Sequence, residues 1–132
     1  MTTFALDTNV VSYLLKNDEH LFQMFDAETD KGNIFLIPPV AYYEIKRGLL
    51  AVKAYNQLKL FDSLCSRLNV GSMTISEWDA AAKIYADLRQ QGKPVEDADI
   101  FIAAFCLVGG YELITRNAKH FTRINGLKVT SW

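Results

Sequence analysis

Short apolar runs alternate with longer amphipathic stretches along the whole chain. Buried strands are predicted at the apolar runs 4–6, 34–37, 70–73, 112–114 and 127–129. Between them, apolar side chains recur every three or four positions, which predicts helices over residues 9–16, 20–28, 38–53, 54–67, 76–91 and 99–108. Strands that alternate with helices favour a parallel sheet with right-handed crossovers. The pattern therefore predicts a three-layer α/β/α fold around a central, mostly parallel sheet of four to five strands.

Two of the predicted helices have an aspartate in or near their first turn. Ser76 and Asp79 resemble a capping box for helix 76–91, with Asp79 in the place of the usual Glu or Gln. Asp99 begins helix 99–108, whose residues are nearly all apolar. Because this stretch is too short to span a bilayer, the helix is expected to be buried at the centre of the domain.

The composition is that of an ordinary globular domain. The chain has 132 residues, half of them apolar and 22% charged, so one domain over residues 1–132 is expected. No apolar run is long enough to cross a membrane, and the N-terminus lacks the pattern of a secretory signal, so a cytoplasmic location is expected. Cys65 and Cys106 form no CxxC motif and are expected to be reduced, buried thiols.

The formal net charge is −1, so no overall positive field draws this protein to nucleic acid. Neutralisation of phosphates supplies most non-specific affinity for nucleic acid, and a binder that depends on its overall charge is therefore disfavoured. An enzyme that holds nucleic acid locally, through a metal ion and a basic rim, remains compatible with this balance.

Polar residues stand at four points that can meet at one edge of the predicted sheet. They are Asp7, Glu44, Asp99 and Asn117. Ligands of open α/β sheets bind at the carboxyl ends of the strands, where Asp7 follows strand 4–6 directly. Other interpretations stay open, because Asp7 and Asp99 also suit helix N-termini and Glu44 suits an ion pair with Lys46 or Arg47.

Taken together, the three carboxylates suggest the chemistry of a hard cation. Mg²⁺ and Mn²⁺ prefer oxygen ligands and need only one or two protein carboxylates beside substrate phosphates. Zinc is disfavoured, because neither His20 nor His120 lies at ligand spacing from the other or from a cysteine. His20 is expected on a helix surface, and His120 on the surface or at a strand edge.

Four motifs in this order resemble the PIN-domain family. They are Leu6-Asp7-Thr8-Asn9, the helix carrying Glu44 and Gly48, residues 97–104 and residues 113–121. The ending, residues 124–129 followed by Trp132, resembles the bacterial VapC toxins. The resemblance covers essentially the whole chain.

The resemblance implies a Mg²⁺- or Mn²⁺-dependent endoribonuclease toxin of a VapBC-type toxin–antitoxin pair, which inhibits translation. In that family the acids that correspond to Asp7, Glu44 and Asp99 bind the metal and are catalytic. Supporting roles are implied for Thr8, Asn9, Thr115 and Asn117. The implied partners are an RNA substrate, with tRNA as a candidate, a VapB-like antitoxin and a second copy of the chain in a homodimer, with no membrane.

Two departures from the family pattern bear on the site. Many PIN domains carry a further acid where this chain has Asn117, and often another where it has His120. Asn117 lowers the negative charge of the site, which disfavours a second tightly bound metal. Asp97 is an additional acid and is expected to be peripheral. Candidate RNA-binding cations are Arg47, Arg116 and Lys119.

Three other functions compete with this interpretation. A phosphoacceptor receiver domain needs paired acids after the first strand and a lysine after a late strand, whereas Thr8-Asn9 and Thr115-Arg116 stand there. A haloacid-dehalogenase-type phosphatase needs an Asp at position 9, which is Asn. The principal alternative is a non-catalytic, degenerate PIN fold that only binds RNA or protein.

Overall fold

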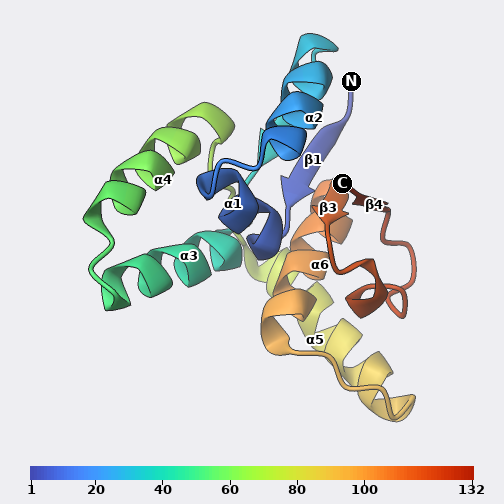
Figure 1. Ribbon diagram of the computed structural model, residues 1–132. Coiled ribbons are helices and arrows are strands. Elements are labelled where there is room, and N and C mark those ends of the chain that lie inside the picture. Colours follow the sequence, from blue (N-terminus) through green and yellow to red (C-terminus); the bar gives the residue numbers. More distant parts are fainter.

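A four-stranded parallel sheet forms the centre of the molecule (Figure 1). The computed structural model describes residues 1–132. The strand order is β2-β1-β3-β4, and every neighbouring pair is parallel. The strands are β1 (Thr3–Leu6), β2 (Ile34–Leu36), β3 (Glu112–Thr115) and β4 (Val129–Ser131). The predicted α/β class and parallel sheet are confirmed.

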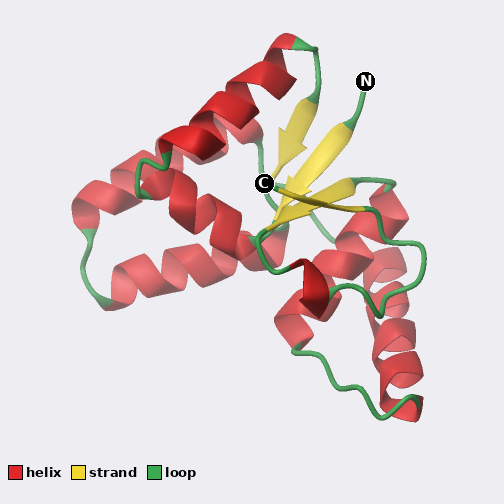
Figure 2. Ribbon diagram, turned by 45° about the vertical axis from the view of Figure 1, so that its right-hand side comes forward, coloured by secondary structure: helices red, strands yellow, loops and turns green.

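Six α-helices and one 3-10 turn connect the strands. They are α1 (Thr8–Leu15), α2 (Glu19–Asp30), α3 (Pro39–Ala51), α4 (Tyr55–Leu68), α5 (Ile75–Gln90), α6 (Asp97–Gly109) and η1 (Ala118–His120). Helices α1 to α4 gather on one side of the sheet, and α5 and α6 lie together on the other (Figures 1 and 2). No helix combines the length and the apolar character that a membrane crossing requires.

Two hydrophobic cores form because side chains of a strand point alternately to opposite faces. Phe4 and Leu6 of β1 pack with buried residues of α1 to α4, whereas Ala5 packs with α5 and α6. On the second face, α6 contributes a nearly continuous buried surface that includes Ile102 and Phe105. The predicted three-layer arrangement is confirmed, and α6 is the buried central helix.

The predicted strand over residues 70–73 is wrong. Only one parallel bridge forms there, between Ile37 and Val70. Asn69 has a positive φ of 71°, which turns the chain out of α4, and Gly71 passes so close to Phe105 that a Cβ atom at that position would overlap its ring. The segment therefore crosses over the second core after a single bridge and continues into α5.

Three element boundaries also differ from the prediction. The cap of α5 is Thr74, whose N–H and hydroxyl donate to the Glu77 carboxylate at 2.7 and 2.6 Å, so the predicted Ser76–Asp79 box is wrong. The last strand lies at residues 129–131, two positions later than predicted. Helix α6 begins at Asp97, so Asp99 lies inside its first turn.

The two cysteines are both free thiols. Cys106 is fully buried in the second core, and burial raises its pKa to about 12. Cys65 is only partly buried on α4, so the prediction of two buried thiols is correct for Cys106 alone.

Candidate active site

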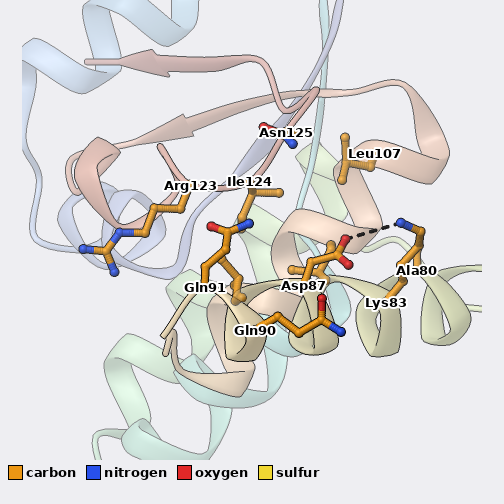
Figure 3. A pocket seen from close by; sticks show the side chains of 11 residues that line it. Ala80, Lys83, Asp87, Gln90, Gln91, Leu107, Arg123, Ile124 and Asn125 are labelled. Carbon is orange, nitrogen blue, oxygen red and sulfur yellow. Dashed lines mark hydrogen bonds and ion pairs between the residues drawn. The ribbon is translucent and has the colours of Figure 1, made fainter. Parts of the chain in front are cut away.

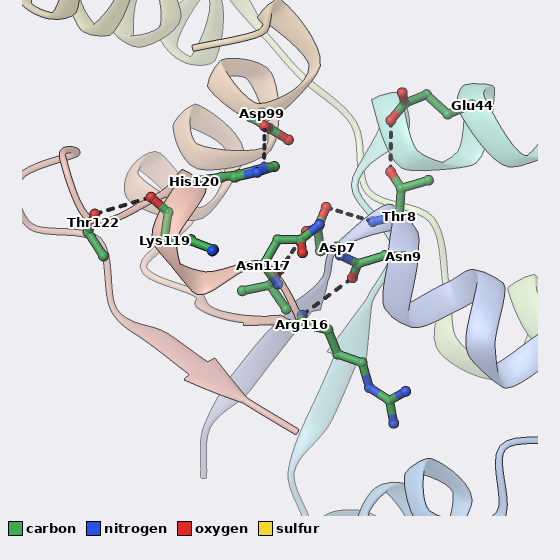
Figure 4. Close-up of polar contacts among 11 residues, drawn as sticks. Asp7, Thr8, Asn9, Glu44, Asp99, Arg116, Asn117, Lys119, His120 and Thr122 are labelled. Atoms are coloured by element: carbon green, nitrogen blue, oxygen red, sulfur yellow. Dashed lines mark hydrogen bonds and ion pairs between the residues drawn. The ribbon is translucent and has the colours of Figure 1, made fainter. Parts of the chain in front are cut away.

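Asp7 lies at the point where β1 ends and α1 begins. Its carboxylate accepts a hydrogen bond from the Thr8 backbone N–H at 2.8 Å and another from the Thr115 hydroxyl at 2.6 Å (Figure 4). Because β1 and β3 are adjacent and parallel, their carboxyl ends bring these side chains together from positions 108 residues apart. Asp7 is only 5% exposed, so its carboxylate is held in one orientation by protein groups.

The environment of Asp7 opposes its ionisation. Burial is the main cause that raises the pKa of Asp7, and the negative charge of Glu44 raises it further. The hydrogen bonds from Thr115 and Thr8 lower that pKa but do not fully offset the burial. None of the ion pairs of the structure includes Asp7. A buried carboxylate without a counter-charge is a group that a cation would stabilise.

Asp99 is the second acid of the site and comes from the first turn of α6. Its pKa is raised, first by burial and then by the nearby charge of Asp7, while His120 lowers it. The Nδ1 atom of His120 lies 3.4 Å from the Asp99 carboxylate. Asp7 and Asp99 lie on the same side of the molecule (Figure 4), and exposed His120, expected at the surface, contacts Asp99.

Glu44 comes from α3 and lies on the other side of Asp7 (Figure 4). Its carboxylate accepts a hydrogen bond from the Thr8 hydroxyl at 2.8 Å, and its second oxygen lies 3.8 Å from the Arg47 guanidinium. Thr8 therefore links the two acids, because its hydroxyl donates to Glu44 and its backbone N–H donates to Asp7. The side chain of Glu44 is thereby oriented toward α1 and Arg47.

No three His, Cys, Asp or Glu side chains converge closely enough to form a preformed metal-binding group. The donor set nevertheless fits a hard cation in its chemistry, because Asp7, Glu44 and Asp99 offer only carboxylate oxygens. Two of these carboxylates are buried enough for their pKa values to be raised, and their mutual repulsion would be relieved by a positive ion. The chemistry of these donors therefore suits a divalent ion.

The predicted supporting residues surround Asp7 on the β3 side. Asn9 accepts a 3.5 Å hydrogen bond from the backbone N–H of Arg116, which ties α1 to the end of β3. The Thr115 hydroxyl accepts a 2.9 Å bond from the Asn117 N–H while it donates to Asp7. Thr115 is fully buried, and these two hydrogen bonds orient its hydroxyl toward the Asp7 carboxylate.

The three predicted RNA-binding side chains differ in the ion pairs and hydrogen bonds that they form within the protein. Arg47 lies beside Glu44, as described. Arg116 pairs with Asp18 at 2.9 Å and donates to the carbonyl of Trp132 at 3.1 Å, so it joins the start of α2 to the C-terminus. Lys119 is exposed and takes part in no ion pair.

Two residues of this region were not found from the sequence. Asp18 accepts a hydrogen bond from the Leu21 N–H as the cap of α2 and also pairs with Arg116. In the sequence it resembles an ordinary helix cap, so nothing there indicated the ion pair. Arg123 is an exposed residue that lines the hollow beside Asp99, and its place in a long loop gave no periodic signal.

Comparison with known proteins shows the family to which this chain belongs. The PIN domain matches residues 4–127, nearly the whole chain. The chain belongs to the PIN-domain family. This PIN domain is 28% identical over 130 residues to "Ribonuclease VapC1" of Haemophilus influenzae, covering 98% of this chain and 97% of that protein. It is 30% identical over 141 residues to "tRNA(fMet)-specific endonuclease VapC" of Shigella flexneri, covering 100% and 99%.

The solved structures agree with this assignment. The crystal structure of DNA-bound VapBC from Salmonella typhimurium contains a chain that superposes on this PIN domain with a TM-score of 0.90. The two are 28% identical, and the match covers 100% of this chain and 99% of that one. The predicted resemblance to VapC proteins is therefore confirmed across the full fold.

Thr115→Val is expected to destabilise this PIN domain at pH 7 by about 2 kcal/mol, because it leaves a buried carboxylate without its hydroxyl donor. The loss should be smaller at pH values below the ordinary pKa of Asp7, 3.8, where the carboxyl is protonated in both the folded and unfolded states and only the Asn117 N–H loses its partner at full cost. Urea unfolding at both pH values measures this change. Thr29→Val, whose hydroxyl donates to the Phe25 carbonyl in α2, is the control. An equal loss at both pH values would contradict the role given to Thr115.

Proposed function

We propose that this PIN domain is a Mg²⁺- or Mn²⁺-dependent endoribonuclease and the toxin of a VapBC-type module. The observation that carries the proposal is the pair Asp7 and Asp99, two partly desolvated carboxylates that share one site at the carboxyl edge of a parallel sheet. The similar proteins named ribonuclease and endonuclease support the same reaction class. A module that only bound RNA or protein would have no need to hold like charges together.

The residues that would hold the metal are Asp7, Asp99 and Glu44. When bound, a divalent ion lowers the pKa of water and offsets the negative charge that develops on a phosphodiester under attack. Thr115 and the Thr8 N–H hold the Asp7 carboxylate in place, and the Thr8 hydroxyl positions Glu44. The imidazole of His120 lies beside Asp99, with Nδ1 3.4 Å from its carboxylate.

The proposed partners are a VapB-like antitoxin and a second copy of the chain. Support comes from the similar chain in the Salmonella typhimurium VapBC complex. Helices α3 and α4 and the turn between them also expose several large apolar side chains that a partner would cover. They are Tyr43, Leu50, Val52, Tyr55 and Leu60. A tRNA substrate, and with it the inhibition of translation, is proposed by similarity to the Shigella flexneri endonuclease.

Purified protein is expected to cleave RNA with Mg²⁺ or Mn²⁺ and to lose this activity in EDTA, with recovery when Mn²⁺ is added back. Incubation with total tRNA and sequencing of the RNA ends would identify both the substrate and the cut position. Growth arrest on expression, relieved by a co-expressed VapB-like antitoxin, tests the toxin assignment. RNA binding without cleavage under every metal condition would instead establish the degenerate, non-catalytic PIN fold.

A further inference from the structure

A hollow of about 490 Å³ opens beside Asp99, between the start of α6 and the segment that follows β3. One wall is acidic and is formed by Glu96 and Asp99. The opposite wall is basic and is formed by Lys119, His120 and Arg123. We call this space the α6–η1 hollow. It adjoins the proposed cleavage site directly, since Asp99 belongs to both.

The basic wall carries two cations that remain free. Neither Lys119 nor Arg123 takes part in an ion pair. By contrast, Arg47 on the α3 side lies against Glu44, and Arg116 is fixed by Asp18 and the C-terminal carbonyl. A phosphate that bound Arg47 or Arg116 would have to compete with these contacts, whereas Lys119 and Arg123 are available at no such cost.

The Arg123 side chain extends outward from its loop. Arg123 also borders a second hollow of about 450 Å³ at the end of α5, where Lys83 and Asp87 form an ion pair at 3.3 Å. Figure 3 shows that the Arg123 guanidinium points away from that pair and from the other residues of the second hollow. The charge of Arg123 is therefore directed away from the α5 end.

We propose that the RNA backbone next to the cleaved bond lies in the α6–η1 hollow and that Lys119 and Arg123 bind its phosphates. This assignment rests on the proposed ribonuclease function and adds the side of the site along which the strand runs. It also adds Arg123, which the sequence did not indicate, as a substrate-binding residue.

The lining of the hollow further indicates what it recognises. None of its residues has an aromatic ring other than the His120 imidazole, and Val95 and Pro94 are its only apolar contributors. Proteins that select bases in single-stranded RNA usually stack them on aromatic rings. Cations without a stacking platform position the backbone and carry little sequence information. The hollow is therefore a phosphate-binding subsite that adds to RNA affinity whatever the base sequence of the RNA.

The test measures RNA binding in a background that cannot cleave, Asp7→Asn. Binding of a labelled, mixed-sequence RNA oligonucleotide is followed by fluorescence anisotropy over a series of KCl concentrations. Lys119→Gln and Arg123→Gln should each weaken binding by roughly three- to tenfold and reduce the salt slope by about 0.7, as expected for one lost phosphate contact. The matched controls are Lys59→Gln and Arg67→Gln on α4, both exposed, which should leave the affinity and the slope unchanged.

The same substitutions in the active protein separate this inference from the proposed function. If the unmodified protein cleaves RNA and both variants keep its affinity, slope and kcat/KM, the α6–η1 hollow does not bind substrate and the inference is wrong. If the unmodified protein never cleaves RNA, the proposed function fails independently of the binding result. Weaker binding of a VapB-like antitoxin with unchanged RNA affinity would also overturn the inference, because it would make the hollow a protein-binding surface.

Discussion

Asp7→Asn is expected to reduce RNA cleavage by about a thousandfold while making the folded protein more stable at pH 7. Cleavage should fall because the amide removes the negative charge at the buried end of β1 that a divalent ion needs. Stability should rise because burial of the Asp7 carboxylate raises its pKa, which means that its ionised form costs folding free energy. One substitution should therefore change activity and stability in opposite directions.

The stability gain should depend on pH in a defined way. Because the pKa of Asp7 is raised in the folded protein, the carboxyl form favours folding below the ordinary pKa of 3.8, and this advantage is lost as pH rises through the folded-state value. The difference in melting temperature between Asp7→Asn and the unmodified protein should be full at pH 7 and shrink as pH falls toward 3.8. Added Mn²⁺ should raise the melting temperature of the unmodified protein and leave that of the variant unchanged.

Asp79→Asn is the control for the same chemical change. Asp79 is an exposed residue of α5 that forms none of the ion pairs, so its amide should alter neither cleavage nor the response to Mn²⁺. Full RNA cleavage by purified Asp7→Asn protein would contradict the assignment of Asp7 to the catalytic centre.

Asp99→Asn is expected to reduce cleavage by about a hundredfold or more, whereas Asp97→Asn should leave it unchanged. Both acids lie in the first turn of α6, where each interacts favourably with the helix N-terminus. Only Asp99 is partly buried, interacts with the charge of Asp7 and lies next to His120. The pair of variants therefore separates a function in the site from a function in helix stability.

The readouts are single-turnover cleavage of RNA and thermal unfolding of both variants. Equal losses of activity in Asp97→Asn and Asp99→Asn, together with equal losses of stability, would show that the acids serve the helix only. Activity lost in Asp99→Asn alone, without loss of stability, is the result that the account requires.

The sequence predicted the β1 end of the site because that part depends on local rules. A short apolar strand followed by small polar residues places Asp7 at the edge of a parallel sheet, and the next strand in space brings Thr115 beside it. The same reasoning placed Asp99 at the start of a buried helix. These positions follow from strand ends and helix starts, which composition and periodicity reveal.

Other features depend on contacts that no local pattern encodes. Residues 70–73 have the composition of a strand, but they form one bridge only, and Gly71 then passes close to the ring of Phe105. Arg116 resembled a free cation in the sequence, whereas its partner Asp18 and the C-terminal carbonyl are distant along the chain. Which cations remain free for substrate was therefore decided by the tertiary structure.

The anomalous diffraction of manganese tests most directly whether Asp7, Asp99 and Glu44 serve one divalent ion. Crystals of the unmodified protein grown with MnCl₂ should give a manganese peak in contact with the carboxylates of Asp7 and Asp99, and crystals of Asp7→Asn should give none there. Protein that cleaves RNA with Mn²⁺ but binds manganese only away from these carboxylates would contradict the account.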